Sequence, residues 1–190
     1  MRASILFAAM FLPLANGQSW EIDPRHSTAQ FSVRHMVISN VRGEFLKVSG
    51  KATYDSKNLK TASLEAVLDV SSITTRDEKR DAHLKSADFL DAAKFPTITF
   101  KSRVFNKNGA GLSIMGDLTM HGVTKPVTLI VDGPSEEIKD SLGKQRIGAS
   151  ATLKLNRKDF GINYNKMLET GGVIVGDEVA ITLDVQLVKK

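Results

Sequence analysis

Apolar and polar side chains alternate along most of the chain with a period of two residues. In residues 61–73, Leu64, Ala66 and Leu68 fall on one face, and residues 177–189 repeat this pattern. Such alternation is typical of β-strands with one solvent-facing side. Eight comparable runs lie near residues 27–36, 42–54, 61–73, 97–106, 111–120, 125–132, 146–157 and 177–189. Turn-forming segments such as NKNGAG separate several runs, so the pattern predicts an all-β domain of antiparallel strands, arranged as a closed barrel or a sandwich.

The second of these runs changes phase partway along its length. Its inward positions pass from Val41, Gly43 and Phe45 to Leu46 and Val48. A slip of one residue beside a glycine is what a β-bulge at a bend produces. We therefore expect this strand to bend.

The inward faces carry smaller residues than a filled core usually does. The small residues are Ala62, Ala66, Gly116, Ala149 and Ala151. An eight-stranded barrel is wide enough either to be filled by side chains or to hold one small ligand. Composition leaves both alternatives open, because the alanines could border a lumen or face large side chains in an ordinary packed core.

The first 17 residues have the pattern of a secretory signal peptide. Arg2 supplies the positive charge, an apolar run extends from Ile5 to Leu14, and Ala15 and Gly17 precede an expected cleavage site before Gln18. The run contains Pro13 and is shorter than the roughly 18 residues that a membrane span requires. We predict residues 1–17 as the signal peptide, residues 18–190 as one domain without an integral membrane span, and a periplasmic location.

Composition narrows the classes of partner. The chain has no cysteine, which removes disulfides, thiol nucleophiles and cysteine-bound metals. Its net charge is +5, but lysine and arginine are interleaved with aspartate and glutamate along the chain. No basic cluster alternates with aromatic residues, so nucleic-acid binding is not expected.

Four segments follow one another over nearly the whole predicted mature chain: WEIDPRHSTAQFSVRHMVISNVRGEF, TTRDEKRDAHLKSADFLDAAKFPTITF, GDLTMHGVTKPVTL and ATLKLNRKDFGINYN. In this order and spacing they resemble the YceI-like family of secreted bacterial lipid-binding proteins. The resemblance implies a lipocalin-like antiparallel barrel whose lumen holds a polyisoprenoid or a similar long-chain amphiphile, in the periplasm and without catalysis. It favours a lumen over a filled core, but it fixes neither the lipid and its head group nor the delivery partner. The oligomeric state also stays open, with a homodimer as one possible arrangement.

Several inward-facing residues are candidates to contact such a ligand. They are Phe31, Val33, His35, Phe45, Leu64, Ala66, Leu68, Phe89, Phe100, Ile114, Ala149, Ala151, Phe160 and Met167. His35 has two interpretations, since a buried imidazole is either a hydrogen-bonded structural residue or a contact for the ligand's head group. Arg157 and Asp159 either pair at a strand end or stand near the barrel mouth.

The charge-rich stretch RDEKRDAHLKSADF, residues 76–89, interrupts the alternating pattern of the strands. Thr75 and Glu78 have the spacing of a capping box, which predicts a short helix within residues 75–92. Asp77 and Arg80 are placed to pair on its surface. Leu84 and Phe89 are available to turn inward. We interpret the segment as a solvated scaffold helix that joins two strands and closes one end of the barrel.

Catalytic and metal-binding patterns are weak. Asp23, His26 and Ser27 have the residue types of a nucleophilic triad, but neighbouring strand residues point to opposite faces and no G-x-S-x-G turn accompanies them. The four histidines stand far apart in sequence. We expect no catalytic residues, no metal and no cofactor. The alternatives are an enzyme acting on a small lipid, and a structural or stress protein with a filled barrel.

Overall fold

The computed structural model describes residues 17–167 and 172–190, so the predicted signal peptide lies outside the described residues except for Gly17. The strands are β1 (Gln18–Ile22), β2 (Thr28–His35), β3 (Ser39–Phe45), β4 (Val48–Tyr54), β5 (Ser63–Asp69), β6 (Ile73–Thr74), β7 (Thr97–Asn108), β8 (Gly111–Met120), β9 (Val123–Asp132), β10 (Ile138–Lys139), β11 (Gln145–Asn156) and β12 (Val175–Lys189). The helices of the described residues are α1 (Glu78–Lys85) and three short 3-10 helices, η1 (Leu59–Thr61), η2 (Val70–Ser72) and η3 (Arg157–Phe160).

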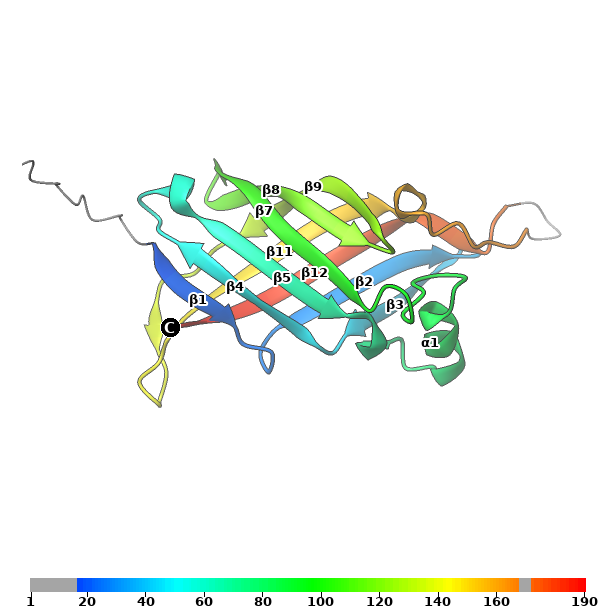
Figure 1. The fold of residues 1–190 in the computed structure, drawn as a ribbon, viewed down its shortest axis with the longest axis horizontal. Coiled ribbons are helices and arrows are strands. Elements are labelled where there is room, and N and C mark those ends of the chain that lie inside the picture. The colour runs from blue at the N-terminus through cyan, green and yellow to red at the C-terminus, as the bar shows by residue number, and fades with distance from the viewer. Residues whose placement is uncertain (1–16, 168–171) are drawn as a thin grey trace, which may run out of the picture.

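The sheet closes on itself as an eight-stranded antiparallel barrel. Around the ring the order is β11, β9, β8, β7, β5, β4, β1 and β12. The closure is a long ladder between β11 and β12, from Arg146 opposite Val188 to Asn156 opposite Glu178. Figure 1 shows the strands winding obliquely around the barrel, with α1 at the end opposite the C-terminus. The barrel expected from the alternation is confirmed, and the sandwich alternative is wrong.

At two places around the barrel, two short strands stand where one continuous strand would otherwise run: β1 with β2, and β3 with β4. Both β1 and β2 pair with β12, β1 near its C-terminal end and β2 along residues 175–184. The second strand of the sequence divides into β3 and β4 at Leu46 and Lys47, whose backbone N–H groups donate to the carbonyl and hydroxyl oxygens of Ser72. The expected bend in this strand is therefore present. Sequence analysis missed β1, because this five-residue strand has few apolar positions from which to recognise a period.

Bare glycines in the wall make room for aromatic rings. Gly43 lies opposite Phe31 in the β2–β3 ladder, and a Cβ atom at position 43 would be 2.4 Å from the Phe31 ring. At Gly116 a Cβ atom would be 2.5 Å from the ring of Phe100. These distances are far below van der Waals contact, so each ring occupies the space that a side chain at the glycine position would need.

The connector between β6 and β7 contains the predicted helix, with a different N-cap. Asp77, not Thr75, caps α1, and its carboxylate accepts a hydrogen bond from the Arg80 N–H at 3.0 Å. The capping-box prediction is therefore wrong: Thr75 is buried, and its hydroxyl donates to Asp81 at 2.6 Å. The Thr75 hydroxyl therefore bonds to side chains of α1 and not to a free backbone amide at the start of the helix. The predicted pairing of Asp77 with Arg80 is present at 3.9 Å.

No helix in the described ranges has both the length and the apolar character needed to cross a membrane. The hydrophobic core consists of side chains that point into the barrel. They form one large cluster and a smaller one around Trp20.

Candidate functional site: an apolar cavity inside the barrel

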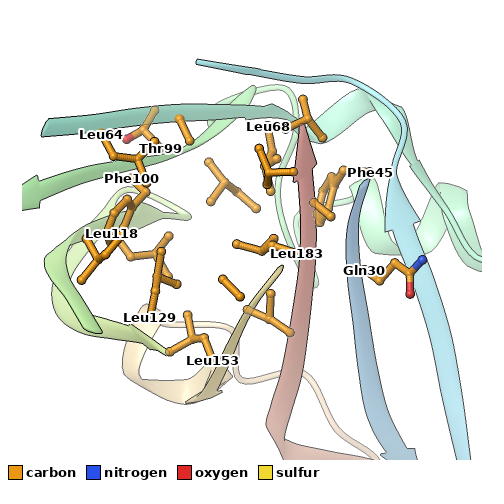
Figure 2. Close-up of a pocket in the computed structure, with 18 of the residues that line it drawn as sticks. Gln30, Phe45, Leu64, Leu68, Thr99, Phe100, Leu118, Leu129, Leu153 and Leu183 are labelled. Atoms are coloured by element: carbon orange, nitrogen blue, oxygen red, sulfur yellow. The ribbon is translucent and has the colours of Figure 1, made fainter. Parts of the chain in front are cut away.

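The barrel encloses a cavity of about 300 Å³. Its wall extends from Trp20 and Tyr54 near one end of the barrel to Arg157 and Ile162 near the other. Figure 2 shows the arrangement of side chains around this space, including Leu64, Phe100, Leu118, Leu129, Leu153 and Leu183, whereas Gln30 points away from it. The wall is almost entirely aliphatic and aromatic, which is the lining expected for an apolar ligand.

Most of the predicted lumen residues lie in the cavity wall. The eleven that line it are Phe31, Val33, Phe45, Leu64, Ala66, Leu68, Phe89, Phe100, Ile114, Ala149 and Ala151. The alternating strand pattern placed them, since residues of one parity on each strand face the same side. Their contact with a ligand stays a prediction.

Three predicted residues are not part of this wall. His35 ends β2, opposite Ser39 on β3 and Val175 on β12. Phe160 is fully buried in η3, where its carbonyl oxygen lies 3.1 Å from Nδ1 of His121. Met167 is 74 % exposed. All three sit at or beyond strand ends, where alternation no longer determines the direction of a side chain.

Sequence analysis omitted several residues that line the cavity. On β11, Leu153 and Leu155 follow Ala149 and Ala151 at every second position and face the cavity with them. On β9, Leu129 and Val131 are likewise two residues apart and face the cavity. The same period that identified the predicted residues could have identified these. The alternating pattern could not identify Trp20 as a lining residue, because β1 has only five residues and is too short to show a period.

The helical connector contributes side chains to the cavity wall at the α1 end. Leu84, Phe89 and Leu90 all contribute to the wall. The His83 ring packs edge-on against both Phe89 and Tyr164, with centroid separations of 5.0 and 4.8 Å. Nε2 of His83 also lies 2.8 Å from a carboxylate oxygen of Asp88. No residue of α1 itself is fully buried, so its charged side chains are solvated while Leu84 turns inward as predicted.

Arg157 is the one charged residue among those lining the cavity, and its guanidinium is fully engaged by the protein. Its Nε donates to the Gly176 carbonyl at 2.9 Å, and Nη1 donates to the Ile162 carbonyl at 2.7 Å. Nη2 lies 3.3 Å from the Asp177 carboxylate, so the charged partner of Arg157 is Asp177 and not Asp159, the partner in one of the two alternatives left open by the sequence. Burial lowers the pKa of Arg157, although Asp177 opposes this effect. Arg157 therefore fastens η3 to the start of β12 and offers no free charge to a ligand.

The opposite end of the wall holds two polar groups of a different kind. Trp20 is 1 % exposed, and its indole N–H has no hydrogen-bond partner in the described part of the chain. Tyr54 also lines the cavity, and burial is the first cause that raises the pKa of its hydroxyl. Buried donors are almost always paired in proteins. Trp20 and Tyr54 thus bring an indole N–H and a phenol hydroxyl to this end of the wall.

Asp23, His26 and Ser27, the three residues considered for a catalytic triad, do not line this cavity and instead form hydrogen bonds within the protein. Nδ1 of His26 lies 2.9 Å from Asp23, and Asp23 also accepts from Arg146 at 2.6 Å. The Ser27 hydroxyl instead bonds to the backbone of Gln186. Within residues 17–167 and 172–190, no three side chains of metal-ligating type gather into a site.

A closed antiparallel barrel around an apolar internal cavity places the protein among the lipocalin-like barrels. The chain belongs to the YceI-like domain family, whose model matches residues 20–187. It is 39% identical to a UPF0312 protein of Vibrio cholerae over 163 residues, which cover 83% of this chain and 85% of that one.

Two solved structures have similar folds. BcnA of Burkholderia cenocepacia matches with a TM-score of 0.74 and 23% identity, covering 87% of this chain and 98% of that one. A polyisoprenoid-binding domain from Saccharophagus degradans, implicated in plant cell wall breakdown, matches with a TM-score of 0.66 and 15% identity, covering 91% and 99%.

Proposed function

We propose that this protein binds a polyisoprenoid or a similar long-chain amphiphile in the barrel lumen and carries or sequesters it without chemical change. The observation that carries the proposal is the internal cavity of about 300 Å³ with its nearly uniform apolar wall. Transfer of a buried methylene group from water contributes about 0.8 kcal/mol, so a long hydrocarbon chain needs few polar contacts to bind well. The description of the S. degradans domain as polyisoprenoid-binding supports the same ligand class.

The wall chemistry favours binding over catalysis. Its charged residue, Arg157, is held by backbone carbonyls and Asp177, and the Asp23 and His26 pair lies outside the cavity. General acid–base catalysis requires a titratable group within reach of the bound molecule. The unpaired Trp20 N–H suits an oxygen acceptor, such as a hydroxyl or carbonyl, on an otherwise apolar ligand.

The signal-peptide pattern of residues 1–17 supports a periplasmic location for this carrier. One experiment tests both the location and the ligand. Protein isolated from the periplasmic fraction without detergent should have the mass of a chain that begins at Gln18. On organic extraction it should release a long-chain isoprenoid or comparable amphiphile in near-stoichiometric amount, identified by mass spectrometry.

Reloading the extracted protein provides the control. Trp20 is the single tryptophan and lines the cavity, so its fluorescence should change as lipid enters. Only trace, heterogeneous lipid on extraction, together with an unresponsive Trp20, would contradict the carrier function. A retained leader would contradict the location.

A further inference from the structure

One end of the barrel carries a cluster of exposed apolar side chains that the cavity does not use. Val37 is 63 % exposed and Ile38 is 78 % exposed, and Met36 and Met167 accompany them. The Met36 N–H donates to the Ile174 carbonyl, while Met167 forms a β-bridge with Val173, so the two segments are neighbours. We call Met36, Val37, Ile38 and Met167 the apolar tip.

The backbone of this tip is unfavourable for the residues it contains. Met36 and Val37 have φ angles of 50° and 65°, and the Ile38 N–H donates to the His35 carbonyl, which closes a tight hairpin turn between β2 and β3. Such turns strongly prefer Asn-Gly, because positive φ is costly for other residues and rare for β-branched ones. Local stability therefore does not explain an exposed Met-Val pair at these positions.

Three basic residues lie next to the tip. Arg34 and Arg42 flank the hairpin turn and are exposed, and no acidic residue lies between them in the sequence. Lys166, also exposed, adjoins Met167. The connection between β2 and β3 lies at the α1 end of the barrel, away from the C-terminus (Figure 1). The tip thus combines protruding apolar side chains with surrounding cations.

We propose that the apolar tip docks on an anionic lipid bilayer, with its apolar side chains entering the headgroup and acyl boundary and the cations contacting lipid phosphates. Segments that combine an apolar surface with basic residues bind membranes in this way. The role of this docking rests on the proposed function: it would bring the barrel to a membrane with which the protein exchanges lipid. The docking itself depends only on the tip.

A second copy of this chain fits the tip less well than a bilayer. Four side chains fall far short of the roughly 800 Å² per partner that a stable interface buries. In a two-fold dimer the same patch would face itself, which would also bring Arg34 and Arg42 against their own copies. A bilayer instead offers apolar depth and negative charge together.

The test uses flotation of the purified protein with vesicles of phosphatidylcholine, with and without phosphatidylglycerol. The triple variant Met36→Asn, Val37→Gly and Ile38→Ser gives the turn its preferred residues and removes the exposed apolar groups. We expect its thermal midpoint to be equal or higher and its partition onto phosphatidylglycerol vesicles to fall about tenfold or more. Arg34→Gln with Arg42→Gln should weaken binding to phosphatidylglycerol vesicles selectively.

The opposite end of the molecule provides a matched control. Leu142 is 81 % exposed, but residues 136–146 contain three acidic and three basic residues, so that loop lacks a basic surround. Leu142→Ser should leave vesicle binding unchanged. Vesicle binding that survives the triple substitution, or a wild-type protein that ignores phosphatidylglycerol vesicles, would overturn the proposal. So would a wild-type dimer that the triple variant converts to monomer without any vesicle binding.

The two proposals can fail separately. Lumen loading is measured with lipid added from solvent and Trp20 fluorescence, and it should be normal in the triple variant. Tip-dependent vesicle binding by a protein that takes up no lipid would support docking while contradicting the carrier function.

Discussion

At the scale of single residues, the smallest side chains of the wall set the space inside the barrel. Gly43 and Gly116 accommodate the rings of Phe31 and Phe100, which lie against the backbone at these positions. Ala66, Ala149 and Ala151 border the cavity directly, whereas Ala62 lies outside its wall. Of the two alternatives that the sequence left open for the small residues, the cavity beside these three alanines favours a lumen over a filled core.

The substitution Ala151→Phe tests whether this lumen receives lipid. In a filled core the larger ring would cost roughly 1–3 kcal/mol. Inside the cavity it enters free space, so the delipidated variant should keep its urea midpoint within error while lipid uptake falls sharply. Delipidated protein is needed because bound ligand itself stabilises the folded state.

Thr152→Phe is the matched control for this substitution, since Thr152 is the next residue on β11 and is exposed. Its uptake of lipid should equal that of the parent. A strong loss of stability in delipidated Ala151→Phe would show that the space is not available to a ligand.

At the scale of elements, Arg157 links η3 to the start of β12 through hydrogen bonds of its guanidinium. Its guanidinium connects η3 with the backbone carbonyls of Ile162 and Gly176, so the chain around the start of β12 is held to the end of β11. Asn165 supports the same junction, since its side chain both donates to and accepts from the backbone of Val175. These contacts hold η3, the segment that follows it and the start of β12 together at the α1 end of the barrel.

We expect Arg157→Met to lower the free energy of unfolding by roughly 2–3 kcal/mol, because buried carbonyl oxygens lose their donors. Arg103→Met is the control: Arg103 pairs with Asp117 at 2.8 Å but is 60 % exposed, and such surface pairs contribute about 1 kcal/mol or less. Urea unfolding measures both variants. Equal losses in the two would contradict the role assigned to Arg157. Amide hydrogen exchange should also rise in residues 172–178 of Arg157→Met alone.

At the scale of the whole molecule, an ion cluster at the end away from α1 ties together distant parts of the chain. Arg146 on β11 donates to Asp23, in the loop between β1 and β2, at 2.6 Å and to Asp140 at 2.7 Å. The bond from Arg146 is the main cause that lowers the pKa of Asp23, with further help from His26. Arg146 is likewise the main cause of the lowered pKa of Asp140.

These lowered pKa values predict acid sensitivity. A carboxyl group with a lower pKa in the folded state stabilises the fold above its unfolded pKa of about 4, and this contribution is lost as pH falls toward the folded value. Asp23→Asn should therefore be less stable than the parent at pH ~7, and the difference should shrink below pH ~4. Urea unfolding followed by Trp20 fluorescence across this range measures it. The exposed Asp159→Asn variant is the control, and a pH-independent gap for Asp23→Asn would contradict the prediction.

The alternation of apolar and polar residues by itself determined most of the strands and their inward faces, and it placed eleven predicted residues in the cavity wall. This is so because side-chain direction in a strand depends on the local backbone, and burial then selects the apolar face. The residues of 75–92 likewise indicated a short helix with Leu84 and Phe89 turned inward. Local pattern failed at strand ends, where His35, Phe160 and Met167 lie, and in the short strand β1.

Only the tertiary structure decided which groups meet across the barrel. The closure of β11 on β12, the pairing of Arg157 with Asp177 and the contact of Arg146 with Asp23 all join residues that the sequence separates. Tertiary packing also buried Thr75, while Asp77, the residue before α1, provides the helix cap. The volume of the lumen was also beyond the sequence, because it depends on how Phe31 and Phe100 lie over Gly43 and Gly116 once the ring of strands has closed.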